Sequence, residues 1–230
     1  MRASASRSKI ITLSIGGSML NPGTPDVNAI RKIASLINSI DSRFMITVGG
    51  GKAARAMVDS ARKLGISEFY SDEIAILQTR ENAMLLKGEL DDAYPSIPKT
   101  PDEAADAINR YRCVVCGGMI PGYTTDSVAV ILAEACGSRR LVNVTNVDGV
   151  YDKDPKEKGA KKYRKMTLSA FADLAARSDQ RKAGTNFVFD SIAAKLAKRS
   201  KIRIDIVSGK DLASVKNAIL GKKHNGTVIS

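Results

Sequence analysis

A polar segment, residues 145–155, combines a hydroxyl, an amide, carboxylates and a glycine in the order Thr-Asn-Val-Asp-Gly-Val-Tyr-Asp-Lys-Asp-Pro. It directly follows the apolar run Leu141–Val144, which predicts a buried strand. In open α/β sheets, ligands bind at the carboxyl ends of the strands. The sequence therefore predicts a ligand site here, with its polar groups in Asn146–Gly149.

Glycine turns end three other predicted strands. Glycine lets backbone N–H groups approach an oxyanion because no Cβ intervenes, and a helix that begins there adds its positive end. One such turn needs no explanation beyond a tight connection, but three at the ends of strands favour phosphate binding. The turns are Gly16-Gly17, Gly49-Gly50-Gly51 and Gly117-Gly118.

Side chains that could bind a phosphate follow two of these turns. Arg55 comes one helical turn after Gly51, so its guanidinium would lean back toward the glycines. After the third turn, Thr124, Thr125 and Asp126 supply hydroxyls and a carboxylate at the start of a predicted helix. These side chains add to the indication of phosphate binding at the second and third turns.

The familiar nucleotide-binding motifs are absent from the sequence. A P-loop requires Ser or Thr after its lysine, whereas here Ala53 follows Lys52. No Gly-x-Gly-x-x-Gly follows a predicted strand, so a dinucleotide-binding fold is not expected. The glycine turns must serve a different way of handling phosphate.

The net charge of +12 at pH 7 indicates a negatively charged partner. Nucleic-acid binders combine such charge with stacking aromatics or a recognition motif, but aromatics make up 5% of this chain and Trp is absent. We therefore expect an anionic small molecule, no nucleic acid and, since no apolar run approaches about 18 residues, no membrane. Three cysteines, an odd number, predict a reducing compartment and a cytoplasmic protein.

Three other groups have a structural explanation beside a functional one. Cys113 and Cys116 could form a redox or metal pair, but they flank two valines in a predicted strand, which favours core packing. His224 is the single histidine, so a catalytic triad or a His-based zinc site is not expected. The stretch Lys153–Lys165 is predicted as a solvated loop, with a phosphate-covering flap as the alternative.

The elements that would position these residues alternate between strand and helix. Such alternation predicts an α/β fold, a three-layer α/β/α sandwich with a mostly parallel central sheet. The predicted strands are Lys9–Ile15, Phe44–Val48, Cys113–Cys116, Leu141–Thr145, Ile202–Val207 and an edge strand at Thr227–Ile229. The predicted helices are Pro25–Ile40, Lys52–Leu64, Ser67–Lys87, Asp102–Arg110, Thr125–Cys136, Thr167–Ala176, Val188–Arg199 and Asp211–Leu220.

Local signals define two of these helices more closely. Thr24 and Pro25 predict an N-cap and a first helical residue for the first long helix. The apolar positions that indicate the helix capped by Ser67 are Ile74, Leu77, Met84 and Leu85.

A change in composition near Tyr151, where lysines become frequent, divides the chain. We expect a flexible N-terminal tail over residues 1–8 and a single domain over residues 9–230. Within that domain, residues 9–150 and 151–230 are predicted to form two lobes.

Several strings occur in the order found in the amino-acid-kinase superfamily, which the chain resembles from Lys9 to Ile229. They are Ser14-Ile15-Gly16-Gly17-Ser18, Val48-Gly49-Gly50-Gly51-Lys52, Thr124-Thr125-Asp126 and Thr145-Asn146-Val147-Asp148-Gly149-Val150-Tyr151. Within the superfamily the chain most resembles the archaeal-type UMP (uridylate) kinases. The strings that indicate this are Gly-Lys-Ala-Ala-Arg at 51–55, Gln-Thr-Arg-Glu-Asn-Ala at 78–83, and residues 117–126.

The resemblance implies transfer of the γ-phosphoryl group of ATP to UMP, giving ADP and UDP for pyrimidine nucleotide biosynthesis. It implies Mg²⁺ that comes with ATP, no metal ligands among the protein side chains, and UMP in the lobe 9–150 with ATP in the lobe 151–230. It also implies a homo-oligomer, a hexamer built from dimers, with the helix after Thr24 as a candidate dimer surface.

The resemblance also implies the site residues. It gives Gly16, Gly17, Ser18 and Asp190 to catalysis, and Gly49, Gly50, Gly51, Arg55, Asp72, Thr124 and Thr125 to UMP. It gives Gly16, Ser18, Thr145, Asn146, Val147, Asp148, Gly149, Tyr151 and Asp154 to ATP, with Tyr151 against the adenine.

The sequence departs from the superfamily at Ser14, where many members carry a lysine that neutralises the transferred phosphoryl group. Archaeal-type UMP kinases also tend to lack this lysine, so the departure agrees with the subfamily. Lys52 and Lys195 are the candidate catalytic cations in its place.

Two alternatives remain beside UMP kinase activity. Another small-acceptor kinase of the superfamily is one, although isopentenyl phosphate kinases typically have a histidine after the second glycine turn, and residues 51–55 contain none. The loss of lysine at Ser14 suggests the other, a nucleotide-binding storage protein without turnover.

Overall fold

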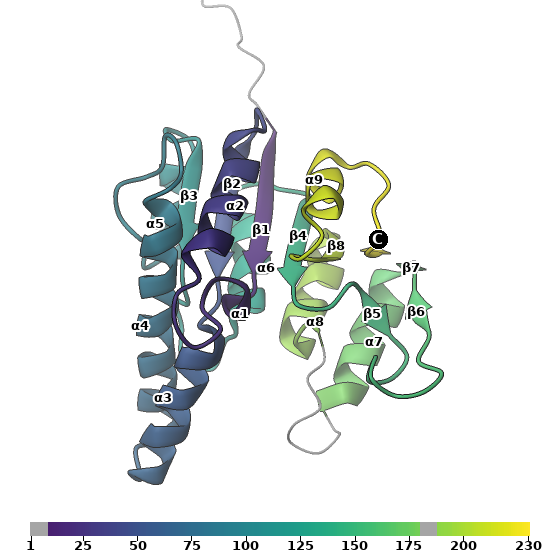
Figure 1. The fold of residues 1–230 in the computed structure, drawn as a ribbon, viewed down its shortest axis with the longest axis horizontal. Helices are drawn as coiled ribbons and strands as arrows, with labels where there is room; N and C mark the ends of the chain where they lie inside the picture. The colour runs from purple at the N-terminus through teal and green to yellow at the C-terminus, as the bar shows by residue number, and fades with distance from the viewer. Residues whose placement is uncertain (1–8, 180–187) are drawn as a thin grey trace, which may run out of the picture.

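The computed structural model describes residues 9–179 and 188–230, with the side chain of residue 179 left out, and the predicted tail at 1–8 lies outside these residues. In the described part of the chain, a seven-stranded sheet has the order β3-β2-β1-β4-β8-β9-β7 (Figure 1). The strands are β1 Ile10–Ile15, β2 Arg43–Val48, β3 Cys113–Cys116, β4 Arg140–Thr145, β7 Lys165–Met166, β8 Arg203–Ser208 and β9 Thr227–Ile229. The neighbouring strands β3, β2, β1, β4 and β8 all pair in parallel, so the prediction of a mostly parallel sheet is confirmed.

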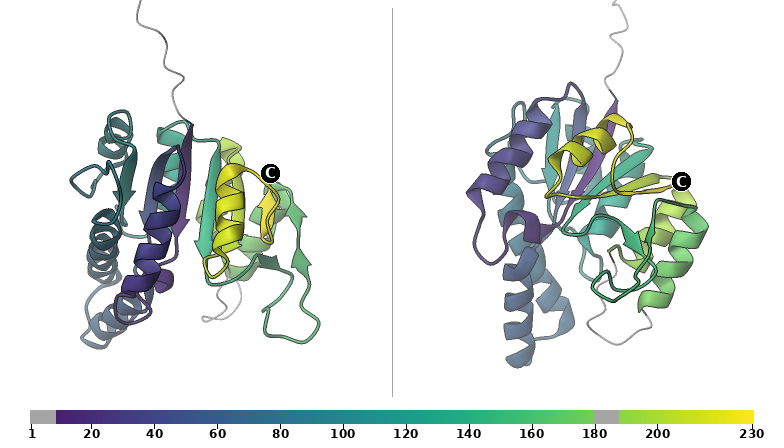
Figure 2. Two further views of the ribbon diagram at one scale, coloured as in Figure 1. Left: turned by 45° about the horizontal axis from the view of Figure 1, so that its top comes forward. Right: turned by 45° about the vertical axis from the view of Figure 1, so that its right-hand side comes forward.

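Helices cover both faces of the sheet, which gives the predicted three layers (Figures 1 and 2). The helices are α1 Gly17–Leu20, α2 Val27–Asn38, α3 Gly51–Lys63, α4 Glu68–Lys87, α5 Pro101–Ala107, α6 Thr125–Ala135, α7 Leu168–Asp179, α8 Ser191–Ser200 and α9 Leu212–Leu220. One face packs against α2, α4 and α9, and the other against α5, α6 and α8. The first of these cores joins residues from both sides of residue 150, since Val207 and Ile219 pack with Ile15.

The alternation of side chains along β3 explains its two cysteines. Cys113 packs in the core under α2 and α4, whereas Cys116 packs under α5 and α6 on the opposite face. Both are free and fully buried, and burial raises the pKa of both thiols, that of Cys113 to about 11. Core packing, the structural explanation, is therefore confirmed.

The first long helix does not begin as predicted. Its N-cap is Asp26, whose Oδ1 accepts the backbone N–H of Ala29 at 3.0 Å, so Thr24 and Pro25 precede the cap. The helix then ends at Asn38 rather than at Ile40.

The apolar positions predicted for α4 do not form its buried face. Leu77, Met84 and Leu85 are exposed, whereas Ile76 and Leu86 are buried. The buried face also includes polar residues, which hydropathy alone does not reveal. These are Ser71, Thr79 and Asn82.

The C-terminal half also differs in detail from the prediction. Thr227–Ile229 is not an edge strand, because β9 lies between β8 and the missed strand β7. A second small sheet of β5 (Val150–Tyr151) and β6 (Lys162–Tyr163) was also missed, and it makes the lysine-rich stretch an antiparallel hairpin. Strands of two residues carry too little periodicity to be read from sequence.

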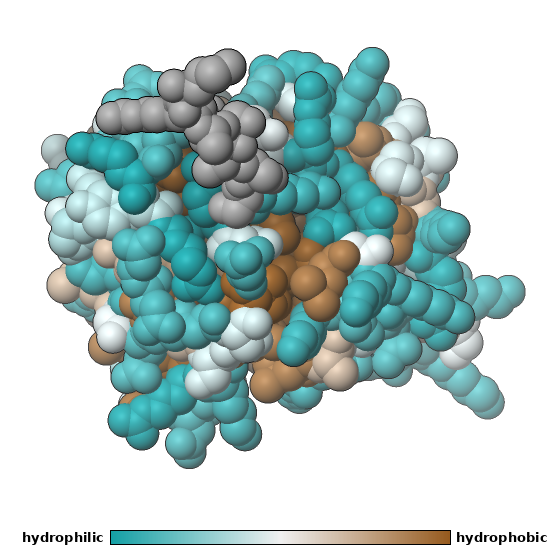
Figure 3. All heavy atoms as spheres, turned by 90° about the horizontal axis from the view of Figure 1, so that it is seen from above, coloured by the Kyte–Doolittle hydropathy of each residue, from teal (hydrophilic) through white to brown (hydrophobic). Residues whose placement is uncertain are grey.

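The face seen from above the view of Figure 1 is mostly polar, with apolar side chains gathered near its centre (Figure 3). The large exposed apolar side chains include a group on α3 and α4 and the turn between them. That group consists of Met57, Leu64, Phe69, Tyr70, Leu77, Met84 and Leu85.

Candidate active site

The first and second glycine turns contact each other directly. A Cβ on Gly17 would lie 2.1 Å from the backbone nitrogen of Gly51 and 2.3 Å from the carbonyl oxygen of Gly49, so no other residue fits there. Gly51 itself has a φ of +71°, which favours glycine. The N-termini of α1 and α3 are thereby brought side by side.

These two helix N-termini have N–H groups available for an anion. The first N–H groups of a helix have no intrahelical partner, and neither Gly16 nor Gly50 has a side chain to cap them. The helix ends also carry partial positive charge. The pair of turns formed by Gly16–Ser18 and Gly49–Gly51 could therefore bind a phosphoryl group.

The third glycine turn has a packing role instead. The backbone N–H of Gly118 donates to Thr79 Oγ1 at 2.7 Å, and a Cβ on Gly117 would lie 2.6 Å from the same oxygen. Because Thr79 occupies this N–H, Gly118 cannot offer it to phosphate. The alternative of a simple tight turn is the better description here.

Asn82, on α4, holds the second glycine turn in place through hydrogen bonds to its backbone. Its Nδ2 donates to the carbonyl oxygens of Gly49 at 2.9 Å and Gly50 at 3.2 Å, while its Oδ1 accepts from Asn21 Nδ2 at 3.0 Å. Both asparagines are buried, so these contacts are shielded from water. Sequence reasoning noted Asn82 only within a string, since its partners lie more than 30 residues away.

Asp190 joins α8 to the start of α6. Its carboxylate caps α8 by accepting the N–H of Ala193 at 2.8 Å, and it accepts from the hydroxyls of Thr124 and of Ser127, the latter at 3.1 Å. Thr124 in turn caps α6 through the N–H of Ser127. The structure thus brings Asp190 and Thr124 together, and adds Ser127, which sequence reasoning missed.

Asp126 and Ser14 form a second contact at the start of α6. Ser14 Oγ donates to Asp126 Oδ1 at 2.8 Å, linking β1 to α6. Burial raises the pKa of Asp126 to about 7, opposed by the Ser14 hydrogen bond and assisted by the negative charge of Asp190. Ser14, which stands where many superfamily members carry a lysine, therefore uses its hydroxyl to bind the carboxyl group of Asp126.

The polar segment after β4 forms its own network. Tyr151 OH donates to Asp148 Oδ1 at 2.9 Å, and Lys162 Nζ donates to Asp148 Oδ2 at 2.6 Å. Burial opposes ionisation of Asp148, but hydrogen bonds from Lys162 and Tyr151 hold its pKa below the ordinary value. Gly149, with a φ of +151°, lies so close to Thr227 that a Cβ would be 2.6 Å from its Oγ1.

A hollow of about 190 Å³ opens beside this network. Lys162, which sequence reasoning missed, links it to the C-terminal segment by donating to the carbonyl of Asn225 at 2.9 Å. The remaining predicted residues lie nearby in sequence: Thr145 Oγ1 contacts Asn146 Oδ1 at 3.3 Å, and Asp154 caps its own loop at Lys156. The hollow is lined by Asp148, Lys162, Arg164, Ser208, Asp211, Ser214, Asn225 and Gly226.

The predicted cations are exposed and unpaired within the described residues. Arg55 and Lys52 lie on the first turns of α3, and Lys195 lies on α8. In the described part of the chain, none of them forms a hydrogen bond or ion pair with Ser14 or Asp126, which bind each other. Asp72, predicted for UMP, accepts the N–H of Gly122 at 2.7 Å.

The single histidine is structural. His224 Nδ1 accepts the N–H of Gly226 at 3.0 Å, and Nε2 lies 3.2 Å from Oδ1 of the fully buried Asp205, which also pairs with Arg203. This contact ties the C-terminal segment to β8. The expectation that His224 serves no catalytic triad agrees with this geometry.

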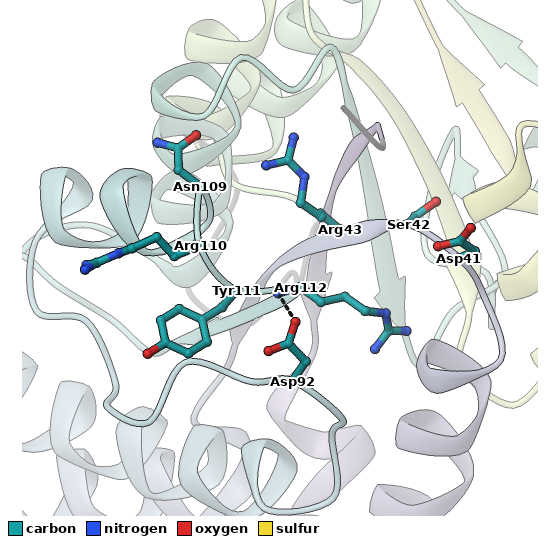
Figure 4. Close-up of a pocket in the computed structure, with 8 residues that line it drawn as sticks. All are labelled: Asp41, Ser42, Arg43, Asp92, Asn109, Arg110, Tyr111 and Arg112. Carbon is teal, nitrogen blue, oxygen red and sulfur yellow. Dashed lines mark hydrogen bonds between the residues drawn. The ribbon is translucent and has the colours of Figure 1, made fainter. Parts of the chain in front are cut away.

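Another hollow, of about 250 Å³, lies at the opposite, amino ends of β2 and β3 (Figure 4). Its side chains point in different directions, and Asp92 accepts the backbone N–H of Arg112 (dashed line). The guanidinium of Arg112 donates to the carbonyls of Ile37 and Ile40, and that of Arg43 to the carbonyl of Ile108. These guanidinium groups hold neighbouring backbone segments together, and the hollow is not part of the candidate site.

The carboxylates of the site do not form a metal cage. Within residues 9–179 and 188–230, no group of three or more His, Cys, Asp or Glu side chains could hold a metal ion. No helix in the same ranges has the length and apolar character needed to cross a membrane.

Comparison with known proteins gives one consistent result. Residues 9–208 match the model of the amino acid kinase family. A uridylate kinase of Methanopyrus kandleri is 43% identical over 222 residues, which cover 94% of this chain and 97% of the relative.

Solved structures agree with these sequence matches. The crystal structure of uridylate kinase from Archaeoglobus fulgidus is 39% identical, with a TM-score of 0.86, and the match covers 96% of this chain and 99% of that chain. UMP kinase from Bacillus anthracis, 23% identical with a TM-score of 0.80 over 97% of this chain and 96% of that one, shares the fold.

Proposed function

The chain belongs to the amino acid kinase family, and from this premise we propose that it transfers the γ-phosphoryl group of ATP to UMP, giving ADP and UDP. The relatives with this activity in their names match nearly the whole chain. The observation that carries the proposal is the contact of Gly17 with Gly49 and Gly51, which joins two uncapped helix N-termini.

The arrangement suits phosphoryl transfer because that reaction needs alignment and charge neutralisation more than a nucleophile. N–H groups from Gly17 and Ser18 would bind the phosphoryl group in transit, and those from Gly51 and Lys52 would bind the acceptor phosphate. Such donors are fixed before the reaction, so they cost no reorganisation. The side chains of Lys52 and Lys195 remain candidate cations for the same group.

Acceptor binding is assigned to the lobe 9–150. Arg55, exposed and unpaired within the described residues, would bind the UMP phosphate with its fork of donors. Thr124 and Thr125 start α6 beside the second turn, and Asp72 would accept from the ribose hydroxyls if Gly122 releases it. Asp190 would keep α6 and α8 in register around the transferred group.

We assign ATP binding to the lobe 151–230 and to the segment Thr145–Asp154, which joins that lobe to the lobe 9–150. Tyr151 would pack against the adenine. A divalent cation accompanies ATP, and we propose Mg²⁺. Because Mg²⁺ commonly binds through substrate phosphates and keeps several waters, the proposed cation would arrive on the triphosphate. Bound there, Mg²⁺ would neutralise charge on the β- and γ-phosphates.

We further propose a homo-oligomer built from dimers, up to a hexamer. The exposed face of α2 carries Arg31 and Lys32, whereas α4 exposes Leu77, Met84 and Leu85, which makes α4 the better contact surface. A cytoplasmic location fits the three free cysteines.

A coupled ADP-release assay with UMP, CMP, isopentenyl phosphate and N-acetylglutamate tests the proposed activity. UMP should give the highest kcat/KM. Tight ATP binding without turnover of any acceptor would instead support a storage protein, and preference for another acceptor would support another kinase of the family.

A further inference from the structure

The hydroxyl of Thr227 connects the two sheets of the fold. Thr227 begins β9 and is fully buried. Its Oγ1 accepts the backbone N–H of Val150 at 2.9 Å and donates to the carbonyl oxygen of Tyr163 at 2.5 Å. Val150 lies in β5 and Tyr163 in β6, so one side chain of the large sheet binds both strands of the small one.

The two backbone groups that Thr227 binds face each other across the hairpin of β5 and β6. Val150 and Tyr163 are register partners in this antiparallel pair. At the next position but one, the N–H of Asp152 donates to the carbonyl of Lys161 at 3.1 Å. Because hydrogen-bonded pairs alternate in an antiparallel ladder, the hydroxyl acts at the following bonded position. Thr227 therefore holds the end of the hairpin that is joined to β4.

The close approach of this hydroxyl depends on Gly149. A Cβ on Gly149 would lie 2.6 Å from Thr227 Oγ1, and the φ of +151° also favours glycine. A side chain at this position would push the hydroxyl away from Val150. The glycine between Asp148 and Val150 therefore serves a contact with the C-terminal segment as well as a turn.

The segment that carries Thr227 is itself fixed. Strand β9 pairs with β8 on one side and with β7 on the other. Just before it, His224 Nδ1 accepts the N–H of Gly226 at 3.0 Å, and Nε2 lies 3.2 Å from Oδ1 of the buried Asp205. The hydroxyl therefore has a defined position against which the hairpin is set.

The hairpin carries two of the residues assigned to ATP. Val150 directly precedes Tyr151, whose hydroxyl donates to Asp148 Oδ1 at 2.9 Å. From β6, Lys162 Nζ donates to Asp148 Oδ2 at 2.6 Å. A shift of the hairpin at Thr227 would therefore move Tyr151 and Asp148 together.

We propose that Thr227 is a positioning residue for ATP, and that its hydroxyl sets the hairpin so that Tyr151 packs against the adenine. The inference rests on the proposed kinase activity and its assignment of ATP. Without the hydroxyl, the N–H of the fully buried Val150 loses this acceptor, and a buried donor without a partner favours local rearrangement. The affinity for ATP then falls, while the acceptor lobe is not contacted by Thr227.

Two substitutions at Thr227 separate the hydroxyl from the rest of the side chain. Thr227→Val removes the hydroxyl and keeps the branched shape, so the dissociation constant of MgATP, measured by calorimetry without an acceptor, should rise about tenfold. The KM for ATP should rise with it, with less change in the KM for UMP. Thr227→Ser keeps the hydroxyl and should bind MgATP within about threefold of wild type. Should T227V not fold, Thr227→Cys, with a weaker hydrogen-bonding group, replaces it.

The matched control is Thr100→Val. It removes another hydroxyl that accepts a backbone N–H, that of Glu103 at 3.2 Å, at the start of α5. T100V should bind MgATP as wild type does. Amide hydrogen exchange without nucleotide should show faster exchange of Val150 in T227V than in wild type, T227S or T100V.

The outcomes distinguish this inference from the kinase activity itself. T227V binding MgATP as tightly as wild type, T227S binding it as weakly as T227V, an equal loss in T100V, or unchanged exchange of Val150 in T227V would overturn the positioning role. A wild type that binds MgATP but prefers another acceptor would remove the proposed function and leave the role of Thr227 intact. A wild type that does not bind MgATP would remove both.

Discussion

Replacing Asp126 with Asn should change how the stability of the folded chain depends on pH. The folded-state pKa of Asp126 is about 7, against an ordinary value of 3.8, because the carboxyl group is buried and lies near Asp190. The protonated form is therefore favoured by folding. Stability from this group is fully present below 3.8 and is lost as the pH rises through the folded-state value.

The size of the effect follows from the difference of the two values. The difference between 3.8 and about 7, at about 1.36 kcal/mol for each pH unit, corresponds to about 4 kcal/mol. Asp126 keeps part of its surface exposed, so this figure is an upper limit. Asn does not titrate, and D126N should not show this loss.

Urea denaturation of both proteins at several pH values measures the effect. The free energy of unfolding of wild type minus that of D126N should fall by up to about 4 kcal/mol between about pH 4 and pH 8. All other titrating groups are shared and cancel in the difference. A difference that is constant, or that rises with pH, would refute the reasoning by showing an ordinary or lowered pKa for Asp126.

Three further predictions concern the proposed active site. Arg55→Ala should raise the KM for UMP about tenfold or more with less change in kcat, because the guanidinium would hold the acceptor phosphate in ground and transition states alike. Lys63→Ala, which removes an exposed cation from the last turn of the same helix, is the control, and an unchanged KM for UMP in the Arg55 variant would exclude this role. Asp190→Asn should lower kcat about 100-fold with little change in either KM, because Asn still caps α8 but carries no charge. Full activity in steady-state assays would remove Asp190 from the mechanism. Gly17→Ala should abolish turnover and lower the melting temperature, because the added Cβ would lie 2.1 Å from the backbone nitrogen of Gly51. A crystal structure of this variant in which the first and second glycine turns keep their positions would contradict this account.

The sheet was predictable because each central strand is an apolar run that ends in a polar or glycine turn. The errors arose where local signals compete. Both Thr24 and Asp26 are good N-cap residues, and only the observed hydrogen bond to Ala29 identifies Asp26. On α4 the apolar residues are divided between the core and the surface, and the polar Asn82 occupies a buried position because it holds the second glycine turn.

The site was predictable in its chain positions but not in its contacts. The glycine turns could be recognised one by one, yet the approach of Gly17 to Gly51 depends on the pairing of β1 with β2. The pair of Ser14 and Asp126 joins residues 112 positions apart, and no local pattern indicates it. Lys162 was missed for the same reason, because its contact with Asp148 requires the hairpin of β5 and β6.

The central claim is that this chain phosphorylates UMP with ATP, and the most direct test is the rate of ADP release with UMP against that with CMP, isopentenyl phosphate and N-acetylglutamate. The account predicts a kcat/KM for UMP that exceeds those for the other acceptors, with UDP as the product identified by chromatography. Release of ADP with another acceptor at a higher kcat/KM, or tight ATP binding without ADP release in the presence of UMP, would contradict it.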